Sequence, residues 1–150
     1  MKTSTLIGKI IQAVWSYPCD PVHLAWVNEL TMPIATSEAF LELSSGELIR
    51  VSPCEVKMDE KQYPSLGLEL ESCTFESTRV VLSSGKVFNV EPLSAAAGML
   101  PFTVADVQES DPLGEGAISQ LCFTGDYSQS LTFRHTMPPM TLGICAFIPG

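Results

Sequence analysis

Positive charge is scarce in this sequence of 150 residues. Its 8 lysines and arginines stand against 17 aspartates and glutamates, which gives a formal net charge of −9. Such an acidic chain repels phosphate backbones and anionic headgroups, so we expect it to bind neither nucleic acid nor membrane. Hydrophobic residues make up 45% of the chain, too many for a disordered protein. The length predicts a single globular domain spanning residues 1–150.

The sequence also lacks a membrane-spanning run and a secretory signal. No stretch approaches the ~20 apolar residues that a spanning helix needs, and Lys9 interrupts the apolar run near the N-terminus. The cysteines are odd in number and widely spaced, without a C-x-x-C pair, unlike a secreted disulfide framework. They are Cys19, Cys54, Cys73, Cys122 and Cys145. We therefore expect a cytoplasmic protein with reduced thiols, and we expect Cys122 and Cys145 to be mostly buried in apolar strands.

One internal pattern occurs twice, at an offset of 39 residues. Residues 41–53 (LELSSGELIRVSP) and 80–92 (VVLSSGKVFNVEP) each contain an apolar stretch, a Ser-Ser-Gly turn, a second apolar stretch and a proline. Glycine at the third turn position supplies the positive φ that a short hairpin loop requires. The pattern predicts two similar hairpins, over residues 40–53 and 79–92.

The remaining periodicity predicts a mainly β fold. Period-2 or apolar runs indicate strands over residues 65–71, 117–124, 130–136 and 141–148, and a strand is also favoured over 6–15. Short helices are expected over 21–30 and 103–109. The fold class is therefore mainly β (α+β at most): an antiparallel sandwich or open barrel built from hairpins, with one or two short helices.

Signatures of catalysis and of cofactor binding are missing. The only histidines are His23 and His135, and neither lies in a recognisable nucleophile motif. A cross-strand carboxylate is expected as the partner of His135. Cys19 and His23 form one close pair of metal ligands, whereas zinc sites usually show two. No glycine-rich phosphate loop is present. We expect no enzyme activity, no metal and no cofactor.

The carboxylates fall into two groups. Nine of them lie between residues 38 and 76, and a second group lies between residues 106 and 115. A negative surface on a sheet face accelerates association with a basic partner, although it also serves solubility. Aromatic residues often anchor the centre of such contacts. The residues expected to bind a partner are Glu69, Glu71, Asp106, Glu109, Asp111, Trp26, Tyr63, Phe75 and Tyr127.

Residues 6–14 (LIGKIIQAV) and 40–48 (FLELSSGEL) resemble small β-rich bacterial proteins similar to the immunity proteins of polymorphic and contact-dependent toxin systems. The resemblance implies an acidic cytoplasmic domain that occludes a basic toxin, and it carries no catalytic residues. The leading hypothesis is therefore a non-enzymatic immunity protein with a basic protein partner. Two alternatives remain: a small β-barrel that binds an apolar ligand or metabolite, and a hydrolase that uses His23 or His135.

Overall fold

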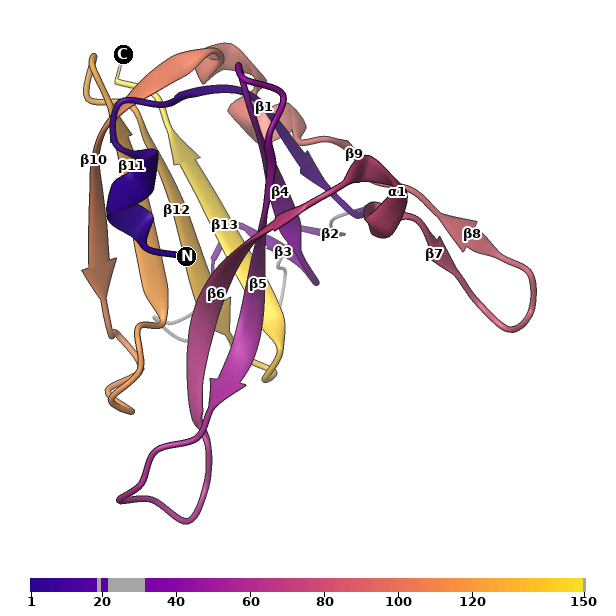
Figure 1. Cartoon of the computed structure of the whole chain (residues 1–150), viewed down its shortest axis with the longest axis vertical. Helices are drawn as coiled ribbons and strands as arrows, with labels where there is room; N and C mark the ends of the chain where they lie inside the picture. Colours follow the sequence, from indigo (N-terminus) through magenta and orange to yellow (C-terminus); the bar gives the residue numbers. More distant parts are fainter. Residues whose placement is uncertain (19, 22–31, 150) are drawn as a thin grey trace.

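The computed structural model describes residues 1–18, 20–21 and 32–149, and these residues form two antiparallel β layers (Figure 1). The first layer contains β1 (Ile10–Ser16), β4 (Ala39–Leu43), β5 (Leu48–Val56), β6 (Ser65–Cys73) and β9 (Glu91–Pro92). The second contains β2 (Asp20–Pro21), β3 (Ile34–Thr36), β10 (Phe102–Ser110), β11 (Gln120–Gly125), β12 (Ser130–Thr136) and β13 (Thr141–Phe147).

The two layers are parts of one sheet that folds back on itself. β10 pairs with β1 in the first layer and with β11 in the second, so the strand order is β2-β3-β13-β12-β11-β10-β1-β4-β5-β6. The sheet is not closed as a barrel. The fold expected from the sequence is thus confirmed as a mainly β antiparallel sandwich.

In the described residues, three short helices lie at the margins of the sandwich. They are η1 (Thr3–Leu6), α1 (Phe75–Thr78) and η2 (Ser94–Met99). Thr74 caps α1, because its side chain accepts a hydrogen bond from the backbone N–H of Ser77. None of them coincides with an expected helix, since the expected helix over 21–30 lies outside the described residues and residues 103–109 form part of β10.

Alternation along the strands builds the core. In β11 and β12 the side chains of Leu121, Phe123, Leu131 and Phe133 point inward, and the two phenylalanine rings meet edge to face at 5.9 Å. The same alternation turns Cys122 outward next to Thr132. Cys122 and Cys145 are both of intermediate exposure, which agrees with the expectation that they would be mostly buried, although neither belongs to the core.

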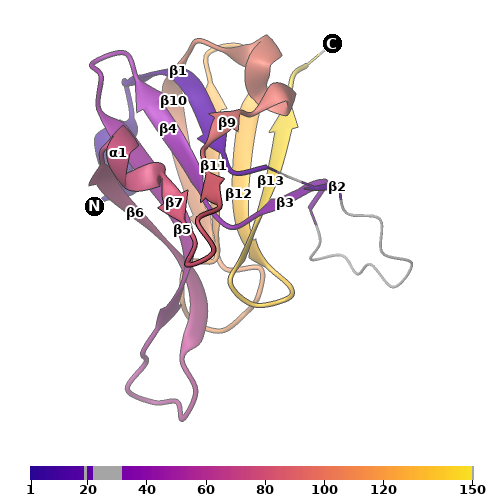
Figure 2. The same cartoon turned by 90° about the vertical axis from the view of Figure 1, so that its right-hand side faces the viewer.

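Both copies of the repeated segment fold as hairpins, and their turns use the same hydrogen bonds. Gly46 donates to the carbonyl of Leu43 at 2.9 Å, and Gly85 donates to the carbonyl of Leu82 at 2.8 Å. Both glycines have positive φ, +93° and +87°. The first hairpin, β4–β5, lies within the sandwich. The second, β7 (Val80–Val81) and β8 (Val87–Phe88), projects away from it (Figures 1 and 2).

Two expected elements differ from those in the structure. Residues 6–15 were expected to form a strand, but β1 begins only at Ile10, because η1 and a turn at Gly8 with φ +85° precede it. Residues 103–109 were expected to form a helix, yet they lie in β10. Pairing with β11 over Val104–Ser110 overrides the local helical pattern.

Candidate functional site

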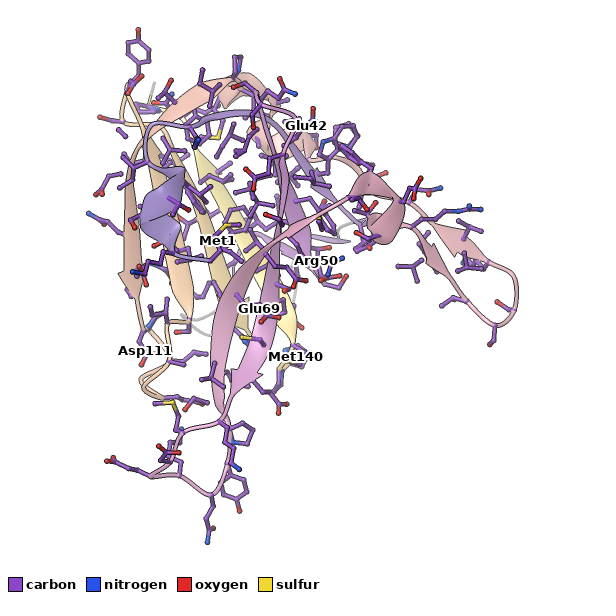
Figure 3. The ribbon with its side chains drawn as sticks, viewed as in Figure 1. Met1, Glu42, Arg50, Glu69, Asp111 and Met140 are labelled. Carbon is purple, nitrogen blue, oxygen red and sulfur yellow. The ribbon has the colours of Figure 1, made fainter. Side chains whose placement is uncertain are left out.

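A groove opens where β6 and the second half of β10 face each other without pairing. Its volume is about 480 Å³, and its lining includes Thr3, Leu68, Glu69, Glu109 and Ile118. Figure 3 places Met1 and Glu69 near each other on this side of the molecule. The volume is within the range of roughly 300–1,000 Å³ that is typical of binding sites. We call this feature the acidic groove.

The strand geometry of β6 gives the groove an apolar floor and a charged border. Leu68 and Leu70 pack against the core from one face of the strand, whereas Glu69 lies between them and points to solvent. Leu121 contributes to the floor from β11. Ile118 adds an apolar side chain that is 41% exposed. A partner in this groove would therefore meet both apolar surface and carboxylate.

Glu109 enters the groove from the opposite border. A register shift between Val104 and Asp106 interrupts the pairing of β10 with β11, and the residues beyond the shift are mostly exposed. The hydroxyl of Thr3 donates a hydrogen bond of 2.6 Å to Oε1 of Glu109, which ties η1 to this border. The groove thus brings together one carboxylate from each of the two acidic groups expected from the sequence.

Both signs of charge line the groove, but in the described part of the chain its two carboxylates are not held in ion pairs. Among the described residues neither Glu69 nor Glu109 takes part in an ion pair. Lys2 lines the groove as well, close to the N-terminus. Two carboxylates above a partly apolar floor are suited to a basic segment that also carries apolar side chains.

The other expected carboxylates have different surroundings. Glu71 accepts a hydrogen bond of 2.5 Å from Nη1 of Arg50, whose Nε lies 3.5 Å from Glu38. Burial raises the pKa of the Glu38 carboxyl, and the opposing effect of Arg50 is smaller. Arg50 also lies over the ring of Phe40, 5.7 Å from its centroid. Glu71 is therefore part of an ion-pair cluster that connects β5 to β6.

Asp111 shapes its own loop. Its carboxylate accepts hydrogen bonds from the backbone N–H groups of Gly114 and Gly116 and from the hydroxyl of Ser119, at 2.8–3.0 Å. Burial acts to raise the pKa of Asp111, but these hydrogen bonds outweigh it and the pKa is lowered. Asp106, in contrast, is exposed on β10 outside the acidic groove.

The expected aromatic anchors do not converge. Tyr63 and Tyr127 are 76% and 84% exposed, the first in the loop between β5 and β6 and the second in the turn between β11 and β12. These two connections lie at opposite ends of the sandwich (Figure 1). Phe75 packs edge to face against Trp15 at 5.5 Å. Trp26, Cys19 and His23 lie outside the described residues.

His135 is fully buried and both of its ring nitrogens are engaged. Nδ1 lies 2.8 Å from the carbonyl oxygen of Gly67, and Nε2 accepts a hydrogen bond of 2.8 Å from the backbone N–H of Met140. With the proton on Nδ1, both contacts are satisfied hydrogen bonds. The expectation of a carboxylate partner was wrong, because backbone groups of β6 and of the turn after β12 take that place.

A second hollow lies at the base of the β7–β8 hairpin. Its volume is about 320 Å³, and Tyr17, Pro18, Ser37, Glu38, Val80 and Phe88 line it. The hydroxyl of Tyr17 donates to the carbonyl of Thr78 at 2.5 Å, which fixes the ring at this position. Burial raises the pKa of the Tyr17 phenol.

Comparisons with protein-family models, with curated proteins and with solved structures found no match to this chain. Within the part of the chain that the structure describes, no helix has the length and apolar character needed to cross a membrane. The same residues bring together no three His, Cys, Asp or Glu side chains that could hold a metal ion.

Sequence reasoning identified Glu69 and Glu109 but missed the rest of the groove. The groove forms only because η1, β6 and the loop before β11 come together in space. These segments contribute Thr3, Leu68 and Ile118 in turn. The clean alternation of residues 65–71 did indicate that Glu69 would point away from the leucines. Nothing in the local sequence indicated which strand would lie opposite.

Proposed function

We propose that this chain is a non-enzymatic binding protein that holds a basic, partly apolar segment of a partner protein in the acidic groove. The observation that carries the proposal is the position of Glu69 and Glu109 on opposite borders of a groove whose floor contains leucine side chains. Unpaired carboxylates accelerate the encounter with a basic segment, and burial of apolar side chains then slows dissociation.

A toxin is the partner that the net charge and the sequence resemblance favour. A protein with a net charge of −9 attracts the basic surface by which many nucleic-acid-cleaving toxins would bind phosphate. By binding to that surface, this chain would keep the toxin from its substrate without catalysing a reaction. A toxin reading frame directly upstream of this gene would support this form of the proposal, and an unrelated neighbour would remove that support.

The test compares two sets of variants that differ in charge position. Glu69→Gln together with Glu109→Gln removes the groove charges, while the amide introduced at position 109 retains an oxygen that can accept from Thr3. Asp106→Asn is the matched control, since Asp106 is exposed on the same strand as Glu109 but outside the groove. The probe is a short synthetic peptide of alternating lysine and leucine, with binding followed by fluorescence anisotropy.

We expect the groove variant to bind this peptide about tenfold more weakly than the native chain, and Asp106→Asn to bind it unchanged. Association with the native chain should slow as salt rises, because the screening length falls to about 8 Å at 0.15 M. Dissociation should change less. Equal weakening by the groove variant and by Asp106→Asn would show a diffuse charge effect and overturn the groove as the binding site.

The hollow beside Tyr17 favours a second candidate function, the binding of a small apolar molecule. Its lining includes Pro18, Val80 and Phe88, and its volume suits a compact ligand. Val80→Glu would place a charge in this hollow without touching the acidic groove. A change in the binding of a fluorescent apolar dye in this variant would support the second function.

A further inference from the structure

The β7–β8 hairpin carries the sequence pattern of a buried element but has no cover. The offset of 39 residues matches Leu41, Leu43 and Leu48 of the first hairpin with Val80, Leu82 and Val87 of the second. The first three are at most 2% exposed, whereas the second three are 38–43% exposed, and Val81 is 59% exposed. We call residues 79–90 the arm.

An uncovered two-stranded ribbon of this kind is poorly stabilised by itself in water. Its exposed apolar side chains form a cluster in sequence and in space, which is typical of an interaction surface rather than of scattered surface residues. At its base Val80 and Phe88 face the hollow beside Tyr17, which leaves Val81, Leu82 and Val87 exposed along the projecting part. Something other than the described part of this chain is expected to cover them.

The charge of the arm is opposite to that of the rest of the molecule. Residues 79–90 contain Arg79 and Lys86 and no carboxylate, in a chain of net charge −9. Among the described residues neither cation forms an ion pair; Lys86 lies over the ring of Phe88, 5.0 Å from its centroid. The arm is therefore a basic, apolar segment, the chemistry that suits the acidic groove.

We propose that the arm of one copy of this chain docks in the acidic groove of a second copy. This inference rests on the proposed function and names a partner for the same groove. Arg79 and Lys86 would approach Glu69 and Glu109, and the exposed valine and leucine side chains would pack on Leu68 and Ile118. A contact between the arms of two copies is less favourable than a contact between arm and groove, because both arms are positively charged.

The arrangement of the elements requires a second molecule. In Figure 1 the arm projects to one side of the sandwich, while η1 and the N-terminus, which border the groove, lie on the other side. An arm cannot reach the groove of its own chain. Beyond Val104, β10 has β11 as its strand partner on one side only, so this border of the groove can accept an added segment. On the other border, the outward N–H groups of Leu66 and Leu68 on β6 already donate to Glu115 and Ile118, so that border contributes side chains only.

The test is a charge exchange between two versions of the full chain. The first carries Arg79→Glu and Lys86→Glu in the arm, and the second carries Glu69→Lys and Glu109→Lys in the groove. Each version alone places like charges at the contact. In a mixture of the two versions, the negative arm of the first can meet the positive groove of the second, and the positive arm of the second can meet the negative groove of the first. Both contacts between unlike versions therefore join opposite charges.

Sedimentation velocity measures the mass at rising protein concentration. We expect the native chain to associate, each version alone to associate at least about tenfold more weakly, and the mixture to recover association. The control Asp106→Lys, outside the groove, should associate like the native chain. A native chain that stays monomeric at the highest concentration, or a mixture that fails to recover association, overturns the proposal.

Two further measurements distinguish a failure of self-association from a failure of the groove as a binding site. If the native chain is monomeric but its groove still binds the lysine–leucine peptide, the self-association fails and the proposed function stands. If the peptide does not bind either, both fail. If the native chain instead binds phosphatidylglycerol vesicles as a monomer and Arg79→Glu with Lys86→Glu abolishes that binding, the arm is a membrane contact and the proposal is overturned.

Discussion

The buried side chain of His135 connects three segments of the chain. It sits on β12, contacts the carbonyl of Gly67 on β6, and accepts a hydrogen bond from Met140 in the turn before β13. Its own backbone N–H donates to the carbonyl of Ser119 at 2.9 Å. Gly67 also leaves room for the loop before β11, because a Cβ at this position would lie 3.1 Å from the carbonyl oxygen of Ile118. His135 therefore holds the two layers together at one end of the sandwich.

His135→Ala should lower the free energy of unfolding by about 3 kcal/mol, because the buried carbonyl of Gly67 and the partly buried N–H of Met140 lose their partner and a space is left behind. Urea denaturation measures this loss. Thr132→Ala is the control, since Thr132 lies on the same strand with its side chain on the outer face. We expect that change to stay within about 0.5 kcal/mol. Similar effects of the two substitutions would contradict a stabilising role for His135.

Identical turn sequences serve two different elements in this protein. The turn at Gly46 connects β4 and β5 inside the sandwich, where Leu41 and Ile49 are completely buried. The turn at Gly85 connects the exposed strands of the arm. The repeated pattern predicted both hairpin turns correctly, because a Ser-Ser-Gly turn depends on local backbone geometry. The second hairpin is shorter than the expected 79–92, since its strands end at Phe88 and Glu91–Pro92 pairs with β1. It could not predict which of them would be buried, because that depends on the strands placed next to each.

Gly46→Ala and Gly85→Ala form a matched pair. An added Cβ has no neighbour within 4 Å at either position, so both changes act through the positive φ alone. Gly46→Ala should lower the global free energy of unfolding by about 1 kcal/mol. Gly85→Ala should leave it almost unchanged, because the arm opens separately from the core.

Denaturation curves and amide hydrogen exchange check this pair. Faster exchange at Leu82, whose N–H bonds to the carbonyl of Lys86, is the expected local effect of Gly85→Ala. Equal global losses for the two variants would mean that the arm unfolds together with the sandwich.

At the scale of the whole molecule, the sequence predicts the class of the fold better than its functional surface. Alternating leucines on β6 and apolar runs on β11–β13 are local signals, and they predicted strands correctly. The helix expected over 103–109 was wrong because residues far away in the chain supply the pairing of β10. The acidic groove has the same long-range origin, since Glu69 and Glu109 meet only after the sheet folds back on itself.

The pH dependence of stability should reflect the loop around Asp111. Its folded-state pKa is lowered from 3.8, so its carboxylate stabilises the fold fully above that value and loses the effect as pH falls through the folded-state pKa. Asp111→Asn should therefore be less stable than the native chain at neutral pH and close to it in strong acid. Thermal unfolding at a series of pH values measures this, and parallel curves for the two chains would contradict it.

The same loop also shields the outer strand of the first layer. Glu115 accepts a hydrogen bond from the backbone N–H of Leu66, and the carbonyl of Ile118 accepts one from Leu68. Strands left without such a cover become templates for the growth of amyloid-like fibrils. Mutual repulsion between molecules is smallest near the isoelectric point of about 4.5, and stronger acid then loosens the cover. In acid the protein should therefore form fibrils while most of each molecule is still folded.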